Sequence, residues 1–242
     1  SDYLFVSSLD GSNMKISVPI GRIAARSNEH IRNYLNKVKE HETAEYGNWQ
    51  KKIIQIVGGV SASENKTFNG YVDQYFKIAQ DSFLGAHRVK FSKNDAGTTS
   101  DAFVDDIQKE IDAGSSIINY FGHGSAQILD VNIGDVKDLN NAGKYPLFIF
   151  NGCALGNSYV GNSLGEDYLF EPNRGTINWI AGTGFGYTSP LLSYTKILHE
   201  ELLQKNYGES IGRSIQATIS RYQNVNDVLN VINSRQLVYQ GD

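Results

Sequence analysis

A single cysteine, Cys153, occurs in the 242 residues, so no disulfide can form within the chain and cysteine usage does not reveal its compartment. The sequence also lacks a proline-rich linker, a low-complexity tract and an internal repeat, and we therefore expect one domain over residues 1–242. No run approaches the roughly 18 to 20 apolar residues that a membrane-spanning helix needs. We expect no membrane span.

An excess of positive charge is absent as well. The formal net charge is -4, and lysine and arginine are scattered along the sequence, so nucleic acid is not an expected partner. What remains is an ordinary globular composition of 40% hydrophobic and 20% charged residues, in a chain long enough to bury a large core.

Short apolar runs alternate with amphipathic segments between residues 19 and 215, the pattern of crossover units on a mostly parallel sheet. The sequence therefore predicts an α/β fold, with a helical part after residue 190. Expected strands are residues 20–24, 52–57, 87–91, 116–121, 146–150 and 176–181, and residues 2–6 also resemble a strand. The two runs at 116–121 and 146–150 are among the most apolar, as in central strands covered on both faces.

Helices are expected between these strands. Ser27 is placed to cap a helix with one buried stripe, formed by Ile31, Tyr34, Leu35 and Val38. Ser100 is placed to cap a second helix over residues 101–113. Further helices are expected at residues 67–83, 191–206, 209–222 and 225–238.

Two residues with reactive side chains follow apolar runs. His123 stands in Gly122-His123-Gly124, and Cys153 follows the run at 145–150. Because ligands of open parallel sheets bind beyond the carboxyl ends of the strands, we expect both side chains at one edge of the sheet. A thiol attacks as its thiolate, and a neighbouring imidazole can take its proton, so the pair is typical of a catalytic dyad.

Each of the two residues alone has an ordinary explanation. A lone cysteine after an apolar strand is usually a small buried hydrophobe, and a lone histidine between glycines is usually loop structure. Their shared edge and the glycines beside them favour the dyad. Gly122, Gly124 and Gly152 allow close approach of a substrate backbone, and the amides of Gly124 and Cys153 are the candidate oxyanion hole.

The blocks at residues 117–125 and 145–153 resemble the catalytic core of gingipain-type cysteine peptidases, which belong to the caspase-like clan. The likeness extends to residues 20–26, which resemble the strand and turn that precede a helix in that family. Residues 174–190 resemble the strand and loop that form one wall of the family's specificity pocket. The resemblance implies a caspase-like fold of three layers around a mostly parallel sheet. It also implies Cys153 as the nucleophile, His123 as the general base and acid, and a protein or peptide as the substrate.

Residues 119–123, 143–146 and 151–153 look closest to sortase-like members of the type IX secretion system of Bacteroidetes. That likeness implies an exported protein at the cell surface or outside it, with secretion-system components as partners. Residues 241–242 resemble the start of a Gly-Asp-Pro motif, and the family's preceding subdomain has no counterpart here. We therefore expect the chain to be an excised part of a longer protein.

The sequence departs from the family at one place. Arginine-specific gingipains carry several acidic residues after the strand equivalent to 52–57, whereas residues 57–68 here hold only Glu64. Cleavage at basic residues is therefore not predicted. Glu64 is a candidate to orient His123 or to face the pocket, but the favoured interpretation is an exposed loop carboxylate. The candidate pocket residues are Ser125, Gly152, Thr183, Tyr187 and Ser189.

Three further patterns are interpreted as carrying no cofactor or metal. The glycine-rich run at 182–186 lacks the third glycine of a dinucleotide site and is interpreted as a pocket wall. Three aspartates lack the alternating ligands of a calcium loop and are interpreted as surface loop: Asp130, Asp135 and Asp138. Four histidines lack metal-ligand spacing and are interpreted as solvated: His30, His41, His87 and His199.

The sequence thus predicts a cysteine peptidase, or a sortase-like acyl transferase, that works through a thioester on Cys153. The alternative is a non-catalytic docking module of a secretion system, with the dyad present but unused. A third possibility is a small-molecule domain with a closed nucleotide pocket.

Overall fold

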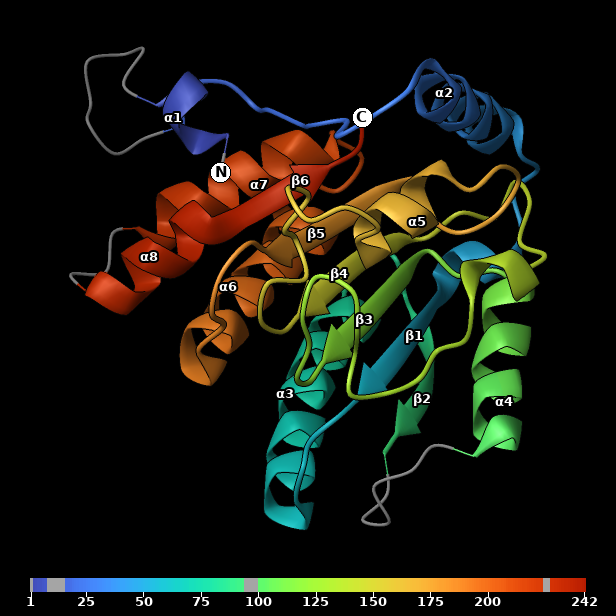
Figure 1. Ribbon diagram of the computed structural model, residues 1–242. Coiled ribbons are helices and arrows are strands. Elements are labelled where there is room, and N and C mark those ends of the chain that lie inside the picture. The colour runs from blue at the N-terminus through green and yellow to red at the C-terminus, as the bar shows by residue number, and fades with distance from the viewer. Residues whose placement is uncertain (1, 8–15, 94–99, 224–226) are drawn as a thin grey trace.

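The computed structural model describes residues 2–7, 16–93, 100–223 and 227–242 (Figure 1). Its centre is a six-stranded sheet in the order β2-β1-β3-β4-β5-β6. All neighbouring strands are parallel except β5 and β6, which confirms a mostly parallel sheet with β3 and β4 in its middle. The strands are β1 (Lys52–Val57), β2 (His87–Ser92), β3 (Ile117–Phe121), β4 (Leu147–Asn151), β5 (Asn178–Gly182) and β6 (Leu237–Gln240).

Helices cover both faces of the sheet, which gives the three expected layers (Figure 1). Because successive strand residues point to opposite faces, Ile54 and Phe148 pack in one core while Ile53 and Ile149 pack in the other. The first core is closed by α2 (Asn28–Thr43), α4 (Asp101–Asp112) and α5 (Leu164–Phe170). The second is closed by α3 (Ala62–Gln80), α6 (Thr188–Glu200) and α7 (Ile211–Tyr222), with α8 (Val228–Gln236) packed on α6 and α7.

Serine side chains begin several of these helices by accepting an amide hydrogen bond. The expected caps Ser27 and Ser100 are confirmed. Ser61 caps α3 in the same way, so this helix begins five residues before the predicted start at residue 67. Glu64 therefore lies in the first turn of α3 rather than in a loop. Within the described ranges, no helix has both the length and the apolar character needed to cross a bilayer.

Several predicted elements are wrong at the two ends of the chain. Residues 2–6 do not form a strand, because Tyr3–Val6 is the short helix α1. In 20–24, only Arg22 pairs with the sheet, through one bridge to Gln240. Of the helix predicted at 225–238, residues 225 and 226 lie outside the described ranges, and the last residues form β6 because they pair with β5. The helix predicted at 191–206 ends as the π-helical turn η3 (Glu201–Lys205).

The buried stripe of α2 also differs from the prediction. Tyr34 is buried, but Ile31 and Leu35 are each 48% exposed, and Lys37 is fully buried instead. The reason is the surface that α2 meets. Its inner side faces the carboxyl end of α5, whose free carbonyl oxygens require N–H donors rather than apolar groups. The Lys37 ammonium donates to the carbonyl oxygens of Tyr168 and Arg174 there, at 2.9 and 2.7 Å.

Candidate active site

His123 and Cys153 lie at the carboxyl edge of the sheet, each two residues beyond one of the paired central strands. Phe121 of β3 is in register with Asn151 of β4, so the chain leaves both strands at the same level. The amide of Gly122 donates to the carbonyl oxygen of Asn151 at 3.1 Å, which holds the starts of the two loops together. The His123 side chain is 47% exposed and Cys153 is partly buried, so solvent reaches this edge.

Glu64 contacts the imidazole of His123. Its Oε2 atom lies 3.1 Å from Nε2 of His123, and the same oxygen accepts the Val60 amide at 2.8 Å. That amide bond is the main cause that holds the pKa of Glu64 below its usual range, and His123 adds to it. The interpretation of Glu64 as an exposed loop carboxylate is therefore wrong. With Nε2 occupied by the carboxylate, Nδ1 is the ring nitrogen left to act as a base.

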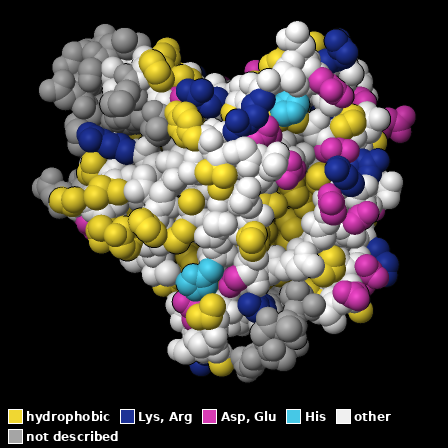
Figure 2. Space-filling view, in the orientation of Figure 1, with side chains coloured by type: hydrophobic (Ala, Val, Ile, Leu, Met, Phe, Trp, Pro, Cys, Tyr) yellow, Lys and Arg dark blue, Asp and Glu magenta, His cyan; other side chains and the backbone are white. Residues whose placement is uncertain are grey.

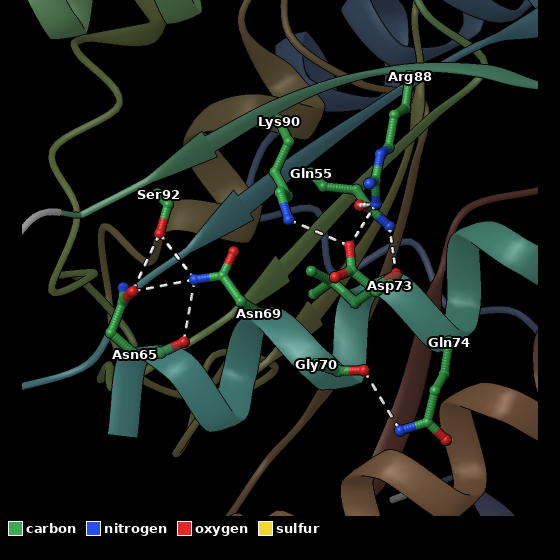
Figure 3. A network of polar contacts seen from close by, with 10 residues as sticks. Gln55, Asn65, Asn69, Gly70, Asp73, Gln74, Arg88, Lys90 and Ser92 are labelled. Atoms are coloured by element: carbon green, nitrogen blue, oxygen red, sulfur yellow. Dashed lines mark hydrogen bonds and ion pairs between the residues drawn. The ribbon is translucent and has the colours of Figure 1, made fainter. Parts of the chain in front are cut away.

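The first turns of α3 are fixed by a polar network with the edge strand β2 (Figure 3). The Asn69 side chain donates to the hydroxyl of Ser92, and that hydroxyl donates to Asn65. The Asn65 side chain also donates to the carbonyl oxygen of Gly58 at 3.0 Å, which ties the loop after β1 to the helix. Farther along α3, Asp73 pairs with both Arg88 and Lys90. This network keeps the turn that carries Glu64 in one position against the sheet.

Cys153 stands in a turn between β4 and α5. The next residue, Ala154, has φ 54°, a left-handed conformation that costs a residue with a side chain about 1 kcal/mol. The Ala154 amide donates to Gly184 at 2.7 Å, and the Gly186 amide points at the sulfur of Cys153, with N and Sγ 3.5 Å apart. The Gly186 amide is therefore a hydrogen-bond donor to the sulfur of Cys153.

The two amides predicted to form an oxyanion hole have no hydrogen-bond acceptor among the residues that the structure describes. Gly124 faces Leu129 as a pair whose flanking residues make the hydrogen bonds, from Ser125 to Ile128 and from Asp130 to His123. This arrangement leaves the Gly124 amide without an acceptor. Among the residues that the structure describes, the Cys153 amide has none either. Both N–H groups are therefore free to donate to a substrate oxygen.

The predicted pocket residues divide into two groups. Gly152 adjoins Gly186 and so lies beside the sulfur, and Tyr187 follows Gly186 directly and is 48% exposed. Ser125, Thr183 and Ser189 lie farther along the surrounding loops. Ser125 is used within the hairpin after His123, and Thr183 bonds the carbonyl oxygen of Gln236. Ser189 is exposed in the first turn of α6. Within the described part of the chain, these three side chains make no hydrogen bond to Cys153.

Hydrophobic side chains remain exposed near this edge. Figure 2 shows them gathered on the side where Figure 1 draws α8 and the start of α6. Phe185, which precedes the Gly186 amide that contacts the sulfur, is 78% exposed, and Val228 on α8 is 72% exposed. Beside the hairpin after His123 there is also a cavity of about 270 Å³, which is lined by Ile128, Val131 and Leu164. The edge therefore offers apolar contact surface near His123 and Cys153.

Asp130 and His199 are less accessible to solvent than the sequence predicts. Asp130 is half-buried and bonded to Gly59 and Tyr120, so it is not a solvated surface residue. His199 is also not solvated: it is 1% exposed and stacked on Tyr75, and burial lowers its pKa to about 4. Within the described ranges, no group of three or more histidine, cysteine, aspartate or glutamate side chains is arranged to hold a metal ion.

Comparison with known proteins places this geometry in a family context. The model of peptidase family C25 matches residues 1–242. No curated protein sequence matches the chain. The crystal structure of the Arg-specific cysteine proteinase gingipain R (RgpB) is similar with a TM-score of 0.75 and 19% identity, over 100% of this chain and 58% of that one.

Two more solved structures are similar. The complex of the pro- and mature domains of RgpB from Porphyromonas gingivalis has a TM-score of 0.76 at 18% identity, over 100% of this chain and 59% of that one. The separase–securin complex of Saccharomyces cerevisiae has a TM-score of 0.52 at 12% identity, over 88% and 13% of the two chains. These likenesses show that the fold is the gingipain and caspase-like α/β fold. The chain spans only 58% of the length of gingipain R.

Proposed function

This chain belongs to peptidase family C25, and from that premise we propose that it is a cysteine peptidase with Cys153 as nucleophile and His123 as general base. The observation that carries the proposal is the contact of Glu64 with Nε2 of His123, at the strand end next to the one that bears the lone thiol. A carboxylate that holds one ring nitrogen orients the imidazole and leaves the other nitrogen free for proton transfer. Residues 1–242 form the catalytic domain in this proposal.

In the first chemical step, Nδ1 of His123 takes the proton of the Cys153 thiol, and the sulfur attacks the carbonyl carbon of the scissile peptide bond. The carbonyl oxygen becomes negatively charged and accepts hydrogen bonds from the amides of Gly124 and Cys153. Collapse of this intermediate breaks the C–N bond. The leaving amine receives the proton from the imidazolium, and the acyl group stays on the sulfur as a thioester.

The thioester is resolved by a second nucleophile. In hydrolysis, His123 removes a proton from water, which attacks the thioester carbon and releases the free thiol and a carboxylic acid. In a sortase-like reaction, an amine takes the place of water and a new peptide bond forms. Mass spectrometry of the products with an added amine distinguishes the two acceptors.

The substrate side chains next to the scissile bond are apolar in this proposal. Glu64, the only acidic residue in the loop after β1 and the first turn of α3, is already engaged by His123 and so does not offer a free carboxylate to a basic side chain. Phe185 and Tyr187 flank the amide that contacts the sulfur, and both are exposed. Large apolar substrate side chains would bury these rings and gain about 1 to 3 kcal/mol each.

Phe185→Ser tests this preference. We expect kcat/KM to fall about tenfold for peptides with large apolar side chains and to change little for peptides with small ones, because the lost contact is hydrophobic. Cleavage of a mixed peptide pool, read by mass spectrometry, measures both classes together. Phe83→Ser is the matched control, since Phe83 is 76% exposed and packs against Tyr207 rather than the site. An equal loss for both peptide classes in Phe185→Ser would contradict an apolar pocket.

The wider setting follows from the resemblance alone. We propose that the protein acts outside the cell or at the cell surface of a member of the Bacteroidetes, with type IX secretion components as partners. The likeness of residues 119–123, 143–146 and 151–153 to sortase-like members supports this. Fractionation of the native host, with antibody detection in the cell-surface fraction, tests the location.

The competing function is a docking module in which the dyad is unused. Alkylation by iodoacetamide separates the two, because Cys153 is the only thiol and every adduct reports on it. An ordinary thiol is only a few per cent thiolate at pH 7, so an imidazole that takes its proton should accelerate alkylation about tenfold or more. We expect His123→Ala to lose that acceleration.

The variant His41→Ala controls for removal of a histidine elsewhere, since His41 lies in α2 beside Trp49. Equal alkylation rates in wild type and His123→Ala would exclude the dyad and favour the docking module. A wild-type rate no higher than that of a free cysteine peptide would do the same.

A further inference from the structure

On the basis of the proposed function, we propose that Asp130 is a positioning residue. As a clamp, it holds the loop after β1, which leads to Glu64, against the hairpin that carries His123. Asp130 contacts neither the sulfur nor the imidazole ring. It acts through the backbone of both loops, so that the carboxylate of Glu64 and Nε2 of His123 meet. The segment joined to the hairpin is Gly58-Gly59, which follows β1 and leads into α3.

The Asp130 side chain bonds to both sides of this junction. Its Oδ2 atom accepts the amide of Gly59 at 2.7 Å, and its Oδ1 atom accepts the hydroxyl of Tyr120. The same hydroxyl lies against the carbonyl oxygen of His123. The backbone amide of Asp130 also donates to that carbonyl oxygen, at 3.0 Å. One aspartate therefore fixes the backbone of His123 and the backbone just ahead of α3.

These bonds close a ring that contains Glu64 and His123. From Asp130 the ring passes to the Gly59 amide, and the neighbouring Val60 amide donates to Glu64 at 2.8 Å. Glu64 contacts Nε2 of His123 at 3.1 Å, and the His123 carbonyl oxygen returns to the Asp130 amide. Two consecutive amides thus hold two different carboxylates. A shift of the loop after β1 relative to the hairpin would have to break one of these bonds.

Two glycines, Gly58 and Gly122, make the space that the Asp130 carboxylate occupies. A Cβ atom on Gly58 would lie 2.0 Å from Oδ1 of Asp130, and one on Gly122 would lie 2.6 Å from it. Only glycine fits at either position while the carboxylate is in place. The carboxylate therefore sits in a space formed by both loops, and its removal would leave the Gly59 amide without an acceptor. Groups that support a catalytic residue in this way set its geometry without touching the substrate.

Asp130→Ala tests the clamp through the alkylation rate of Cys153 by iodoacetamide, which needs no identified substrate. We expect the rate to fall about fivefold to tenfold, because the imidazole is no longer held in line with the thiol. Asp130→Asn should restore the rate to within about twofold of wild type. Its amide oxygen can accept the Gly59 amide, and its amide N–H can donate to the Tyr120 hydroxyl, which then donates to His123.

The decisive measurement is a double-mutant cycle with Glu64→Ala, which removes the acceptor for both Val60 and His123. If Asp130 acts by aligning Glu64 with His123, Asp130→Ala should change the rate by less than about twofold once Glu64 is gone. A general loosening of the fold would slow or speed alkylation equally in both backgrounds. If Asp130→Ala does not fold, as thermal melting will show, Tyr120→Phe replaces it in the same cycle.

The following results would overturn the clamp: an unchanged rate in Asp130→Ala, an Asn variant as slow as the Ala variant, or equal effects in the two Glu64 backgrounds. His123→Ala keeps the two hypotheses apart. If its rate is slow while Asp130→Ala is fast, the clamp fails and the dyad stands. If its rate equals that of wild type, the proposed function itself fails.

Discussion

Cys153→Ala is expected to lower kcat/KM by about 10⁴- to 10⁶-fold for a peptide that the wild-type protein cleaves. The sulfur forms the bond to the substrate carbon, so its loss removes the covalent step and leaves His123 with no thiol proton to transfer. Cys153 is the only cysteine, and no other thiol can take its place. The measurement is steady-state cleavage of that peptide by both proteins, with equal folding checked by circular dichroism.

Ser158→Ala is the matched control in the same loop. The Ser158 carbonyl oxygen accepts a hydrogen bond from Arg26, and alanine keeps that carbonyl, so we expect wild-type activity. Activity near the wild-type level in Cys153→Ala would remove the thiol from the mechanism. The proposed pair of Cys153 and His123 would then be excluded as the source of the cleavage.

Lys37→Met is expected to lower the free energy of unfolding by about 3 kcal/mol, because buried carbonyl oxygens lose their donor. The ammonium of Lys37 donates to the carbonyl oxygens of Tyr168, Glu171 and Arg174, at 2.9, 3.2 and 2.7 Å. Methionine fills a similar volume but donates nothing. Urea unfolding followed by fluorescence measures the difference. Lys39→Met, which replaces an exposed lysine of the same helix, should change it little.

The same lysine predicts a pH dependence. Burial lowers the pKa of Lys37 to about 7 from its ordinary value of 10.5. Between these values the unfolded chain holds a proton that the folded chain releases, so the stability of the wild type rises with pH over this window. Lys37→Met lacks this contribution, and the stability gap to wild type should widen from pH 7 to 9.5. A constant gap would mean that the folded protein keeps Lys37 charged.

The middle of the sheet could be predicted from the sequence because its strands are buried on both faces. The strands at 117–121 and 147–151 are mostly apolar, and every residue of both is buried. The ends of the chain could not be predicted as well. The four residues Leu237–Gln240 are too few to distinguish the end of a helix from an edge strand. Their pairing with β5 makes them a strand.

Contacts between distant parts of the chain explain why the sequence did not predict the surroundings of Glu64 and Asp130. Glu64 reaches His123 only because Ser61 starts α3 early, a cap that periodicity alone did not reveal. The sequence around Asp130 is that of a surface loop. Its hydrogen-bond partners, Gly59 and Tyr120, lie on other segments and are not visible in the local pattern. The paired glycines at 58 and 59 were the available signal, because such a pair marks a close approach of other atoms to the backbone. Gly186, which contacts the sulfur, carried no separate signal within its glycine-rich run.

By itself, the order of residues determined the class of fold, the two central strands and the positions of His123 and Cys153 after them. Local hydrophobic patterns are enough for this, since they select strands and helices within a short window. The tertiary structure alone decided that Glu64 meets His123, that Asp130 joins their loops and that Lys37 is buried. Each of these depends on atoms far apart in the chain that come together only when the layers pack.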